Sequence, residues 1–414
     1  MSLTILLDLD DTLLGNSMDT FLPAYMQALG EYLAPYAPPE KMIPALLAAT
    51  QAMVANTRPD CTLLEIFNAS FFSALGLQPE ELGDVIDNFY QEVFPDLKDL
   101  TRQLPQAVDF VEQALARGYR LAIATSPLFS RQAVLQRLEW AGLSPEAYPF
   151  SLIASAEDFH FAKPHPEFYA ETLARLGWPE QPALMVGDDL YNDIEPARRL
   201  GLPAYWINPQ GAAVPVGPYT PTAGGSLSGL LPWLDSIYPE SLTPDYDHPE
   251  AVLAILRSSP AALQAIFAGL ASYSWIDKPR PGEWNLAEVV CHLRDVDGEV
   301  HLPRLSRVLA EENPFIAGVD SDSWAEERLY YCQNGPQALH SFMANRLALL
   351  DLLENTSPAD WERPIRHAIF GPSQFKELVR IIAGHDRLHI RQVSDTLQAS
   401  SSYISAVAGT PSLD

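Results

Sequence analysis

Leu3-Thr4-Ile5-Leu6-Leu7-Asp8-Leu9-Asp10-Asp11-Thr12 is the stretch of this 414-residue chain that decides its fold class. An apolar run that ends in acidic residues is typical of a buried strand followed by a polar loop. Asp8 and Asp10 are two residues apart, so their side chains point the same way at the end of the strand. In parallel sheets, the carboxyl ends of the strands are where ligands bind. The stretch therefore predicts a first strand with two carboxylates at a binding edge.

Further apolar runs alternate with helical stretches up to residue 207. Strands are predicted at Leu3–Leu9, Arg120–Thr125, Phe150–Ala154, Ala183–Val186 and Leu202–Ile207. This alternation favours an α/β fold, with a Rossmann-like parallel sheet formed by residues 1–16 and 101–207. Residues 17–100 show helical periodicity only, and we interpret them as a helical cap inserted into that core.

A second acidic cluster, Gly187-Asp188-Asp189-Leu190-Tyr191-Asn192-Asp193, follows the strand predicted before it. If this strand and the first one are neighbours, Asp8, Asp10 and Asp188 converge. Carboxylates packed together repel one another, and Mg²⁺ with oxygen ligands suits such a site. The cluster therefore predicts a magnesium site at the carboxyl edge of the sheet.

Two further residues fit phosphoryl chemistry at this edge. Lys163, in Lys163-Pro164-His165-Pro166, is a fixed cation for a phosphoryl oxygen, and Thr125 ends a predicted strand with a hydroxyl donor. Each motif alone is more typical of a turn, a helix cap or a surface loop. Together, in this order and each at a strand end, they favour a catalytic site.

The ordered motifs resemble those of the haloacid dehalogenase superfamily of aspartate-nucleophile phosphohydrolases, over about residues 1–207. They are Asp8-Leu9-Asp10-Asp11-Thr12, Thr125, Lys163-Pro164, and Gly187-Asp188 with Asp193. The resemblance implies that Asp8 attacks phosphorus and that Asp10 acts as acid and then as base. It also implies that Thr125 and Lys163 hold phosphoryl oxygens. The presence of Asp10 favours phosphate-ester hydrolysis over cleavage of a carbon–halogen bond.

The same resemblance implies how the metal is held. Mg²⁺ would be bound by the Asp8 carboxylate, the Asp10 backbone carbonyl and Asp188, with Asp189 or Asp193 in support. The substrate would be a small-molecule phosphate ester selected by the cap. Candidate cap contacts are Phe21, Tyr25, Asn56, Arg58 and Phe72. Their ordinary interpretation is cap core for the aromatic residues and surface for Arg58, and their spacing does not identify the ester.

The second half of the chain has a different pattern. Residues 208–247 are rich in Pro and Gly, and we interpret them as a linker that contains one short helix or turn near Leu227–Leu234. Residues 248–396 show almost no strand signal. Their long amphipathic stretches predict an all-α four-helix bundle domain, followed by a tail over residues 397–414. The expected helices are Ala251–Ala271, Asn285–Glu311, Pro336–Asn355 and Ser373–Gln398.

Three histidines stand out in the predicted bundle. His385 and His389 are four residues apart, on one helix face, and His292 lies within another predicted helix. Three imidazoles with an open position would suit Zn²⁺ or Ni²⁺. By spacing alone, such a pair is more often a polar feature of a helix surface or interface. Cys291 points about 100° away from His292 and is interpreted as core.

The sequence around these histidines resembles the DinB/YfiT-like superfamily of four-helix metal-binding proteins, over about residues 248–396. The matching segments run from Trp284 to Asp295 and from Gly384 to Gln392, with Arg304 and Arg346 between them. The resemblance implies one divalent metal on His292, His385 and His389. It also implies a low-molecular-weight thiol as a partner, S-transferase or hydrolase chemistry, and a homodimer. Asn285 or Asp295 could cap a helix or support the metal ligands.

Composition restricts the function classes. The net charge is −27, which disfavours nucleic acid and anionic membranes as partners. The sequence has no uninterrupted apolar stretch of ~20 residues, so it predicts no membrane span. Its N-terminus does not resemble a signal peptide. Three widely spaced cysteines favour a reducing cytoplasm. The sequence thus predicts a magnesium phosphatase fused to a metal-binding bundle; a bifunctional chain and a non-enzymatic scaffold are the alternatives.

Overall fold

The computed structural model describes residues 3–208, 210–215, 217–280 and 282–408. It divides into two compact units. One comprises Met1–Thr172 and Pro179–Tyr246, and the other comprises Asp247–Asp414 together with Leu173–Trp178. Each unit is described by itself below.

A six-stranded sheet organises the first unit, in the order β5-β4-β1-β6-β7-β8. Every neighbouring pair in it is parallel, so the Rossmann-like fold class is confirmed. All five strands expected from the sequence are present. They are β1 (Thr4–Leu7), β4 (Arg120–Ile123), β5 (Leu152–Ile153), β6 (Ala183–Gly187) and β7 (Ala204–Ile207).

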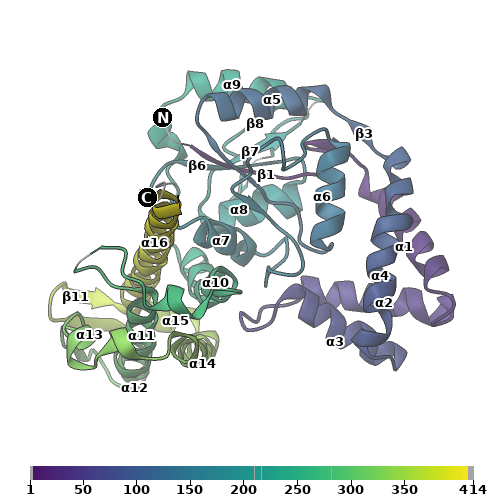
Figure 1. Ribbon diagram of the computed structural model, residues 1–414. Helices are drawn as coiled ribbons and strands as arrows, with labels where there is room; N and C mark the ends of the chain where they lie inside the picture. The colour runs from purple at the N-terminus through teal and green to yellow at the C-terminus, as the bar shows by residue number, and fades with distance from the viewer. Residues whose placement is uncertain (1–2, 209, 216, 281, 409–414) are drawn as a thin grey trace, which may run out of the picture. The chain divides into compact units, whose positions relative to one another are not determined.

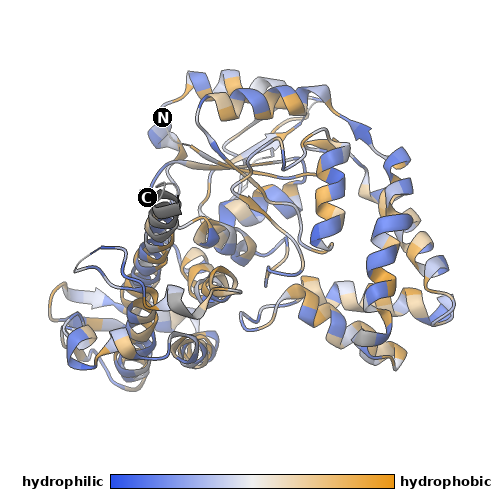
Figure 2. Cartoon of the chain, viewed as in Figure 1, coloured by the Kyte–Doolittle hydropathy of each residue, from blue (hydrophilic) through white to orange (hydrophobic). Residues whose placement is uncertain are grey.

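Helices cover both faces of this sheet. Figure 1 shows α5 (Pro105–Ala116) and α9 (Leu227–Ser236) side by side on one side, with α7 (Pro166–Arg175) and α8 (Glu195–Leu200) on the other. Alternate strand residues such as Ile5 and Leu7 belong to one core cluster with α5, α6 (Arg131–Trp140) and α9. Figure 2 shows the matching pattern, with apolar strands at the centre and helices that are apolar on one side.

The cap consists of helices, as expected for residues 17–100. They are α1 (Met18–Tyr32), α2 (Pro39–Val54), α3 (Leu63–Leu75), α4 (Pro79–Glu92) and the 3₁₀ segment η1 (Phe94–Leu100). Thr62 and Glu65 form a capping box that fixes the start of α3. The two connections between core and cap, β2 (Leu14–Gly15) and β3 (Arg102–Gln103), pair with each other in an antiparallel ribbon.

The linker expected over residues 208–247 is only partly correct. The short helix expected near Leu227–Leu234 is present as α9, but a strand that joins the sheet was not expected. Ala223–Gly225 forms β8, which pairs in parallel with β7, and the backbone of Asn208 donates to the carbonyl of Gly225 at 2.8 Å. Helix α9 then buries Leu227, Leu230 and Leu231 against the core. The Ala-Gly-Gly strand has no side-chain pattern, so only its ladder hydrogen bonds identify it.

The second unit contains the expected bundle helices. They are α10 (Pro249–Phe267), α11 (Leu286–Val296), α12 (Leu302–Ala310), α14 (Gly335–Glu354) and α16 (Phe375–Ala408). A π-helical turn, η5 (Asp297–His301), separates α11 from α12 where the sequence predicted one continuous helix. Helix α16 continues past residue 396 into the expected tail, whose residues 409–414 lie outside the described part of the chain.

A small sheet, in the order β11-β10-β9, was not expected from the sequence. Its strands are β9 (Phe315–Ile316), β10 (Pro364–His367) and β11 (Gly371–Gln374), and β10 and β11 form a hairpin. The short helices α13 (Trp324–Glu327) and α15 (Pro358–Trp361) complete the loops of this unit. The strands are two to four residues long, and β10 and β11 contain proline, glycine and polar residues, so they carry no clear strand signal.

One described helix is long and apolar enough to cross a membrane by length and composition alone. It is α10, which has a mean hydropathy of 1.2 and is 67% buried over the stretch concerned. Its apolar residues pack against α14 and α16, as expected for the core helix of a bundle.

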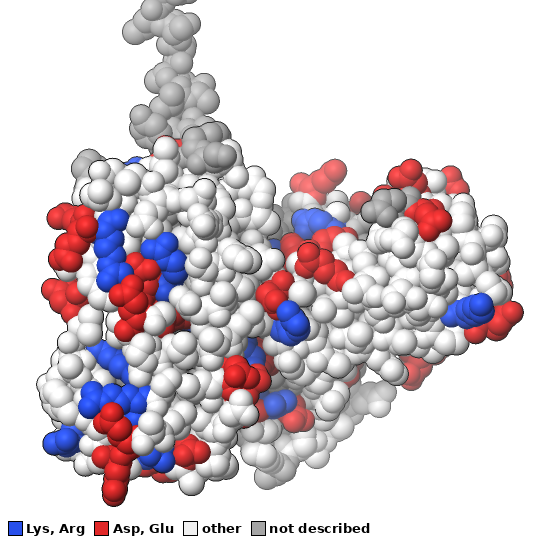
Figure 3. Space-filling model, turned by 90° about the horizontal axis from the view of Figure 1, so that it is seen from below, with Lys and Arg blue, Asp and Glu red and all other residues white. Residues whose placement is uncertain are grey.

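The acidic and basic side chains on the face seen in Figure 3 are scattered over the surface.

Candidate functional site

The acidic site lies where three neighbouring strands end. Asp8 directly follows β1, and its backbone N–H donates to the carbonyl of Val186 in β6 at 2.9 Å. Asp188 directly follows β6, and Thr125 comes two residues after β4. Because β1 lies between β4 and β6, all three side chains belong to one edge of the sheet. Of the three residues predicted to converge, Asp8 and Asp188 lie in one carboxylate cluster, and Asp10 lines the same cavity.

Lys163 ties the carboxylates together. Its Nζ donates to Asp8 Oδ1 at 2.7 Å and to Asp193 Oδ1 at 2.5 Å. One oxygen each from Asp8, Asp188 and Asp193 lies within 4.8 Å of the others, close enough to share one cation. A cavity of about 540 Å³ opens over these residues and over Thr125 and Asp10.

The electrostatics of this cluster favour a cation. Burial raises the pKa of Asp8 well above its usual range, although Lys163 opposes the shift. Burial and the neighbouring Asp193 raise the pKa of Asp188 to about 7. Burial alone would lower the pKa of Lys163, but Asp193 and Asp8 outweigh it and raise that pKa. A divalent ion would stabilise the ionised carboxylates, so this donor set fits Mg²⁺.

The carboxylates of Asp10 and Asp189 have partners outside the cluster, whereas the metal contact predicted for Asp10 is through its backbone carbonyl. Asp10 accepts from Asn16 Nδ2 at 2.7 Å and from Arg137 Nη1 at 2.8 Å, and its carboxylate is not part of the three-carboxylate cluster. Asp189 caps η2 (Leu190–Ile194) by accepting backbone N–H bonds from that turn. Asp189 is therefore a structural cap beside the site, whereas Asp193 is in the cluster.

Gly187 allows this close packing. A Cβ atom at this position would lie 2.1 Å from Asp193 Oδ2, so any side chain would displace that carboxylate. The glycine before Asp188 thus has a steric reason that the motif alone does not give.

Of the five candidate cap contacts, only Tyr25 lines the cavity. Phe21 and Phe72 are buried in the cap core, and Asn56 donates to the His160 carbonyl at 2.8 Å. Arg58 forms an exposed ion pair with Asp60 at 2.7 Å. The cavity is instead lined by residues that the sequence analysis missed, including Leu22, Met26, Leu46, Phe67 and Phe129. Which face of each cap helix meets the cavity depends on tertiary packing, so the sequence held no direct signal.

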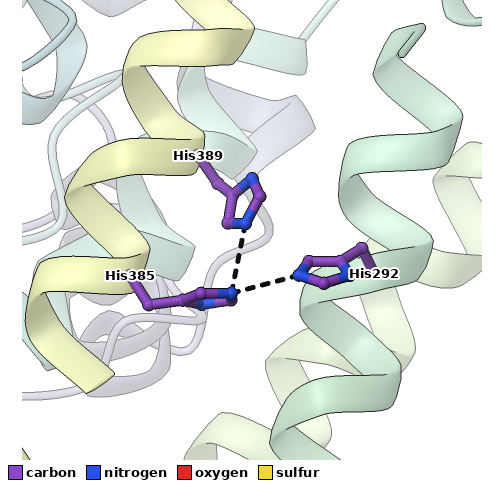
Figure 4. A group of neighbouring side chains, drawn as sticks. All are labelled: His292, His385 and His389. Atoms are coloured by element: carbon purple, nitrogen blue, oxygen red, sulfur yellow. Dashed lines mark hydrogen bonds between the residues drawn. The ribbon is translucent and has the colours of Figure 1, made fainter. Parts of the chain in front are cut away.

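The three histidines of the second unit come together from two helices (Figure 4). His385 Nε2 lies 3.1 Å from His292 Nε2 and 3.1 Å from His389 Nε2. Tetrahedral ligands about 2.0–2.1 Å from a zinc ion lie about 3.3 Å apart, so this spacing fits one shared metal. Burial lowers the pKa of His292 to about 3 and also lowers the pKa values of His385 and His389. The imidazoles are thus neutral, the form that binds metals.

Neighbouring groups orient these rings. His389 Nδ1 lies 2.9 Å from Gln392 Oε1, which leaves Nε2 free to act as a ligand atom. Trp284 stacks on the ring of His389, with centroids 6.0 Å apart and planes 4° apart. A fourth histidine, His301, has its ring centroid 5.4 Å from that of His385, and the sequence analysis missed it.

The roles left open for Asn285 and Asp295 differ. Asn285 caps α11 and forms a capping box with Glu288. Asp295 accepts from Arg294 at 2.6 Å and from the Tyr330 hydroxyl at 2.7 Å, and it is not part of the histidine cluster. Cys291 is fully buried, as expected for a core residue.

Comparison with protein-family models gives two matches. Residues 5–207 match the haloacid dehalogenase-like hydrolase family, and residues 255–393 match the DinB superfamily. The N-terminal part of the chain is therefore a haloacid dehalogenase-like hydrolase domain, and the C-terminal part is a DinB domain.

Curated relatives include two enzymes. The chain is 27% identical to pyrophosphatase PpaX of Bacillus pumilus over 192 residues, which is 46% of this chain and 76% of that protein. It is 29% identical to a phosphoserine phosphatase of Thermus thermophilus over 133 residues, which is 32% of this chain and 49% of the relative. Among solved structures, YfiT from Bacillus subtilis is 19% identical, with a TM-score of 0.34, over 40% of this chain and 91% of that protein.

Proposed function

We propose that the N-terminal domain hydrolyses a small-molecule phosphate monoester with Mg²⁺, through an aspartyl-phosphate on Asp8. The observation that carries this proposal is the cluster of Asp8, Lys163, Asp188 and Asp193 at the end of three parallel strands. The phosphatases among the relatives support the reaction class. Since these relatives differ in substrate, they do not define the ester.

The proposal assigns each step of the reaction to a residue of this site. A carboxylate oxygen of Asp8 attacks phosphorus, the bond from phosphorus to the leaving oxygen breaks, and Asp10 gives that oxygen a proton. Asp10 then takes a proton from a water molecule whose oxygen attacks phosphorus, and the bond to Asp8 breaks. Lys163 and Thr125 hold the equatorial oxygens. Mg²⁺, when bound, would neutralise charge on the transferring group, and Asp8, Asp188 and Asp193 would hold it.

The metal requirement gives the first test. Full-length protein assayed on a panel of phosphate monoesters should release phosphate with Mg²⁺ and lose that activity in EDTA, because the clustered carboxylates would repel an unaccompanied phosphate dianion. Added Mg²⁺ should restore turnover. Equal turnover in EDTA would contradict the proposed metal site.

We further propose that His292, His385 and His389 bind one divalent transition metal, Zn²⁺ or Ni²⁺. The spacing and burial of the three Nε2 atoms support this site. The three imidazoles would hold the metal, and the metal would supply Lewis-acid chemistry suited to S-transfer or hydrolysis, which would make the chain bifunctional. A low-molecular-weight thiol, a homodimer and a cytoplasmic location remain predictions from sequence.

Removal of one imidazole tests this second site. His385→Ala should lower zinc affinity by at least about 100-fold, since two ligands cannot complete a stable tetrahedral site. Metal content by elemental analysis and titration with a zinc indicator measure the effect. His340→Ala, on α14 and outside the histidine cluster, is the matched control. A His385→Ala protein that retains zinc as wild type does would refute the site.

A further inference from the structure

The walls of the cavity over Asp8 differ from its floor. The floor carries the acidic cluster, whereas the side that belongs to the cap is mostly apolar. Leu22 and Phe67 are only half-buried and face the cavity with Met26, Leu46 and, from the loop after β4, Phe129. Partly exposed apolar side chains that converge on one cavity are typical of a site for an apolar group.

Basic side chains are scarce around this cavity. Among its described lining residues, Lys163 is the one cation, and it is already shared by Asp8 and Asp193. The cap has three basic residues, Lys41, Arg58 and Lys98, and none of them lines the cavity.

Carboxylates, in contrast, extend beyond the metal cluster. Asp10, Asp11, Asp19 and Asp189 also line the cavity. Arg137 neutralises the charge of Asp10 only. Its side chain is fully buried and does not line the cavity. The charge of a phosphoryl group can be balanced by Lys163 and Mg²⁺. A second anionic group on the substrate would meet further carboxylates and have no counter-charge.

One alternative source of positive charge lies nearby. A second cavity, of about 450 Å³, shares Thr50, Val54, Pro164 and Tyr191 with the first, and its lining includes His165 and Arg199. A long anionic substrate could reach Arg199 only by extending past Tyr191. The contribution of Arg199 is therefore a separate arm of the test below.

We propose that the cap selects phosphate monoesters whose leaving group is an uncharged, largely apolar alcohol. The leaving group fills the space between α1, α2 and α3, and the carboxylates beside it discriminate against carboxylated and doubly phosphorylated compounds. This specificity rests on the proposed phosphatase function. It differs from the substrates named for the two relatives, pyrophosphate and phosphoserine, which carry additional ionised groups.

A matched pair of substrates tests the proposal with full-length protein and Mg²⁺. The pair is phenyl phosphate and 4-carboxyphenyl phosphate, with 4-(hydroxymethyl)phenyl phosphate as the neutral polar control. The kcat/KM value should be about 100-fold or more lower for the carboxylated ester than for phenyl phosphate, because like charges face each other unpaired. The neutral polar ester should lie closer to phenyl phosphate.

Variants of the wall give a second readout. Phe67→Arg adds a cation and should reduce the discrimination against the carboxylated ester at least about tenfold, whereas Phe67→Gln, the uncharged control, should not. Leu22→Arg serves the same purpose if the first variant fails to fold. Arg199→Met should leave the discrimination unchanged.

The outcomes separate the two claims. The apolar specificity is overturned if the wild-type protein prefers the carboxylated ester, or if Arg199→Met changes the discrimination between the two esters. In either case the phosphatase function still stands. Absence of turnover with every ester tested, phosphoserine and pyrophosphate included, would instead refute the proposed function itself.

Discussion

Asp8→Asn should lower phosphatase turnover by about 10⁴-fold or more, since it removes the proposed nucleophile. The amide has nearly the same shape as the carboxylate but is a far weaker nucleophile. The fold should survive, because Lys163 keeps its ion pair with Asp193 at 2.5 Å and is not left as an unpaired buried charge. Steady-state kinetics with Mg²⁺, beside the circular dichroism spectrum and thermal midpoint, measure both expectations.

A matched control separates loss of the nucleophile from loss of charge. Asp235→Asn makes the same chemical change in an exposed ion pair with Arg117, where the aspartate side chain is 60% exposed. Its turnover should equal that of wild type, because surface pairs contribute little. An Asp8→Asn protein that is folded and retains more than a few per cent of wild-type turnover would show that Asp8 is not the nucleophile.

Arg346→Met should destabilise the bundle by about 3–5 kcal/mol. Arg346 is fully buried on α14, and its guanidinium pairs with Asp297 at 2.8 Å, with Asp386 and with the carbonyl of Leu256 at 3.0 Å. It therefore links α10, η5 and α16 to its own helix. Without it, buried Asp386 would lose its ion pair, and buried Asp297 would keep only its contact with His301 Nδ1 at 2.9 Å. Urea denaturation measures the loss in free energy of unfolding. Hydrogen exchange of peptides from residues 247–400 assigns that loss to this domain.

Two further variants make the Arg346 result specific. Lys376→Met breaks a pair with Glu362 in which both side chains are at least 38% exposed, and it should cost only about 0–1 kcal/mol. Adding Asp297→Asn and Asp386→Asn to Arg346→Met should recover part of the lost stability, because no buried charge is then unpaired. An Arg346→Met protein with wild-type resistance to urea would refute the role of the ion group.

Part of the acidic cluster could be predicted from the sequence because two of its carboxylates follow apolar strands directly. Asp8 and Asp188 each come directly after a strand, so strand order alone places them together. The ion pair of Asp10 with Arg137 could not be predicted, because the two residues are 127 positions apart in the sequence. Strand β8 was missed because its Ala-Gly-Gly sequence reads as a loop.

The histidine site was also only partly predictable from the sequence. His385 and His389 lie on adjacent turns of one helix, and their spacing in the sequence alone predicts this. His301 lies nine residues after His292, and an unbroken α-helix would put it about 180° away. The π-helical turn of η5 breaks this regular spacing between the two residues, and His301 lies beside His385. Helical periodicity cannot predict such a turn.

The central claim is that Asp8 carries the phosphoryl group during turnover. Rapid acid quenching of the full-length protein, mixed with Mg²⁺ and the best ester found in the panel, tests it directly when the digest is analysed by peptide mass spectrometry. We expect a phosphoryl group on the peptide that contains Asp8, present during turnover and absent from the Asp8→Asn protein. Continued turnover with no phosphoryl group on that peptide at any quench time, or with the group on another residue, would contradict the account.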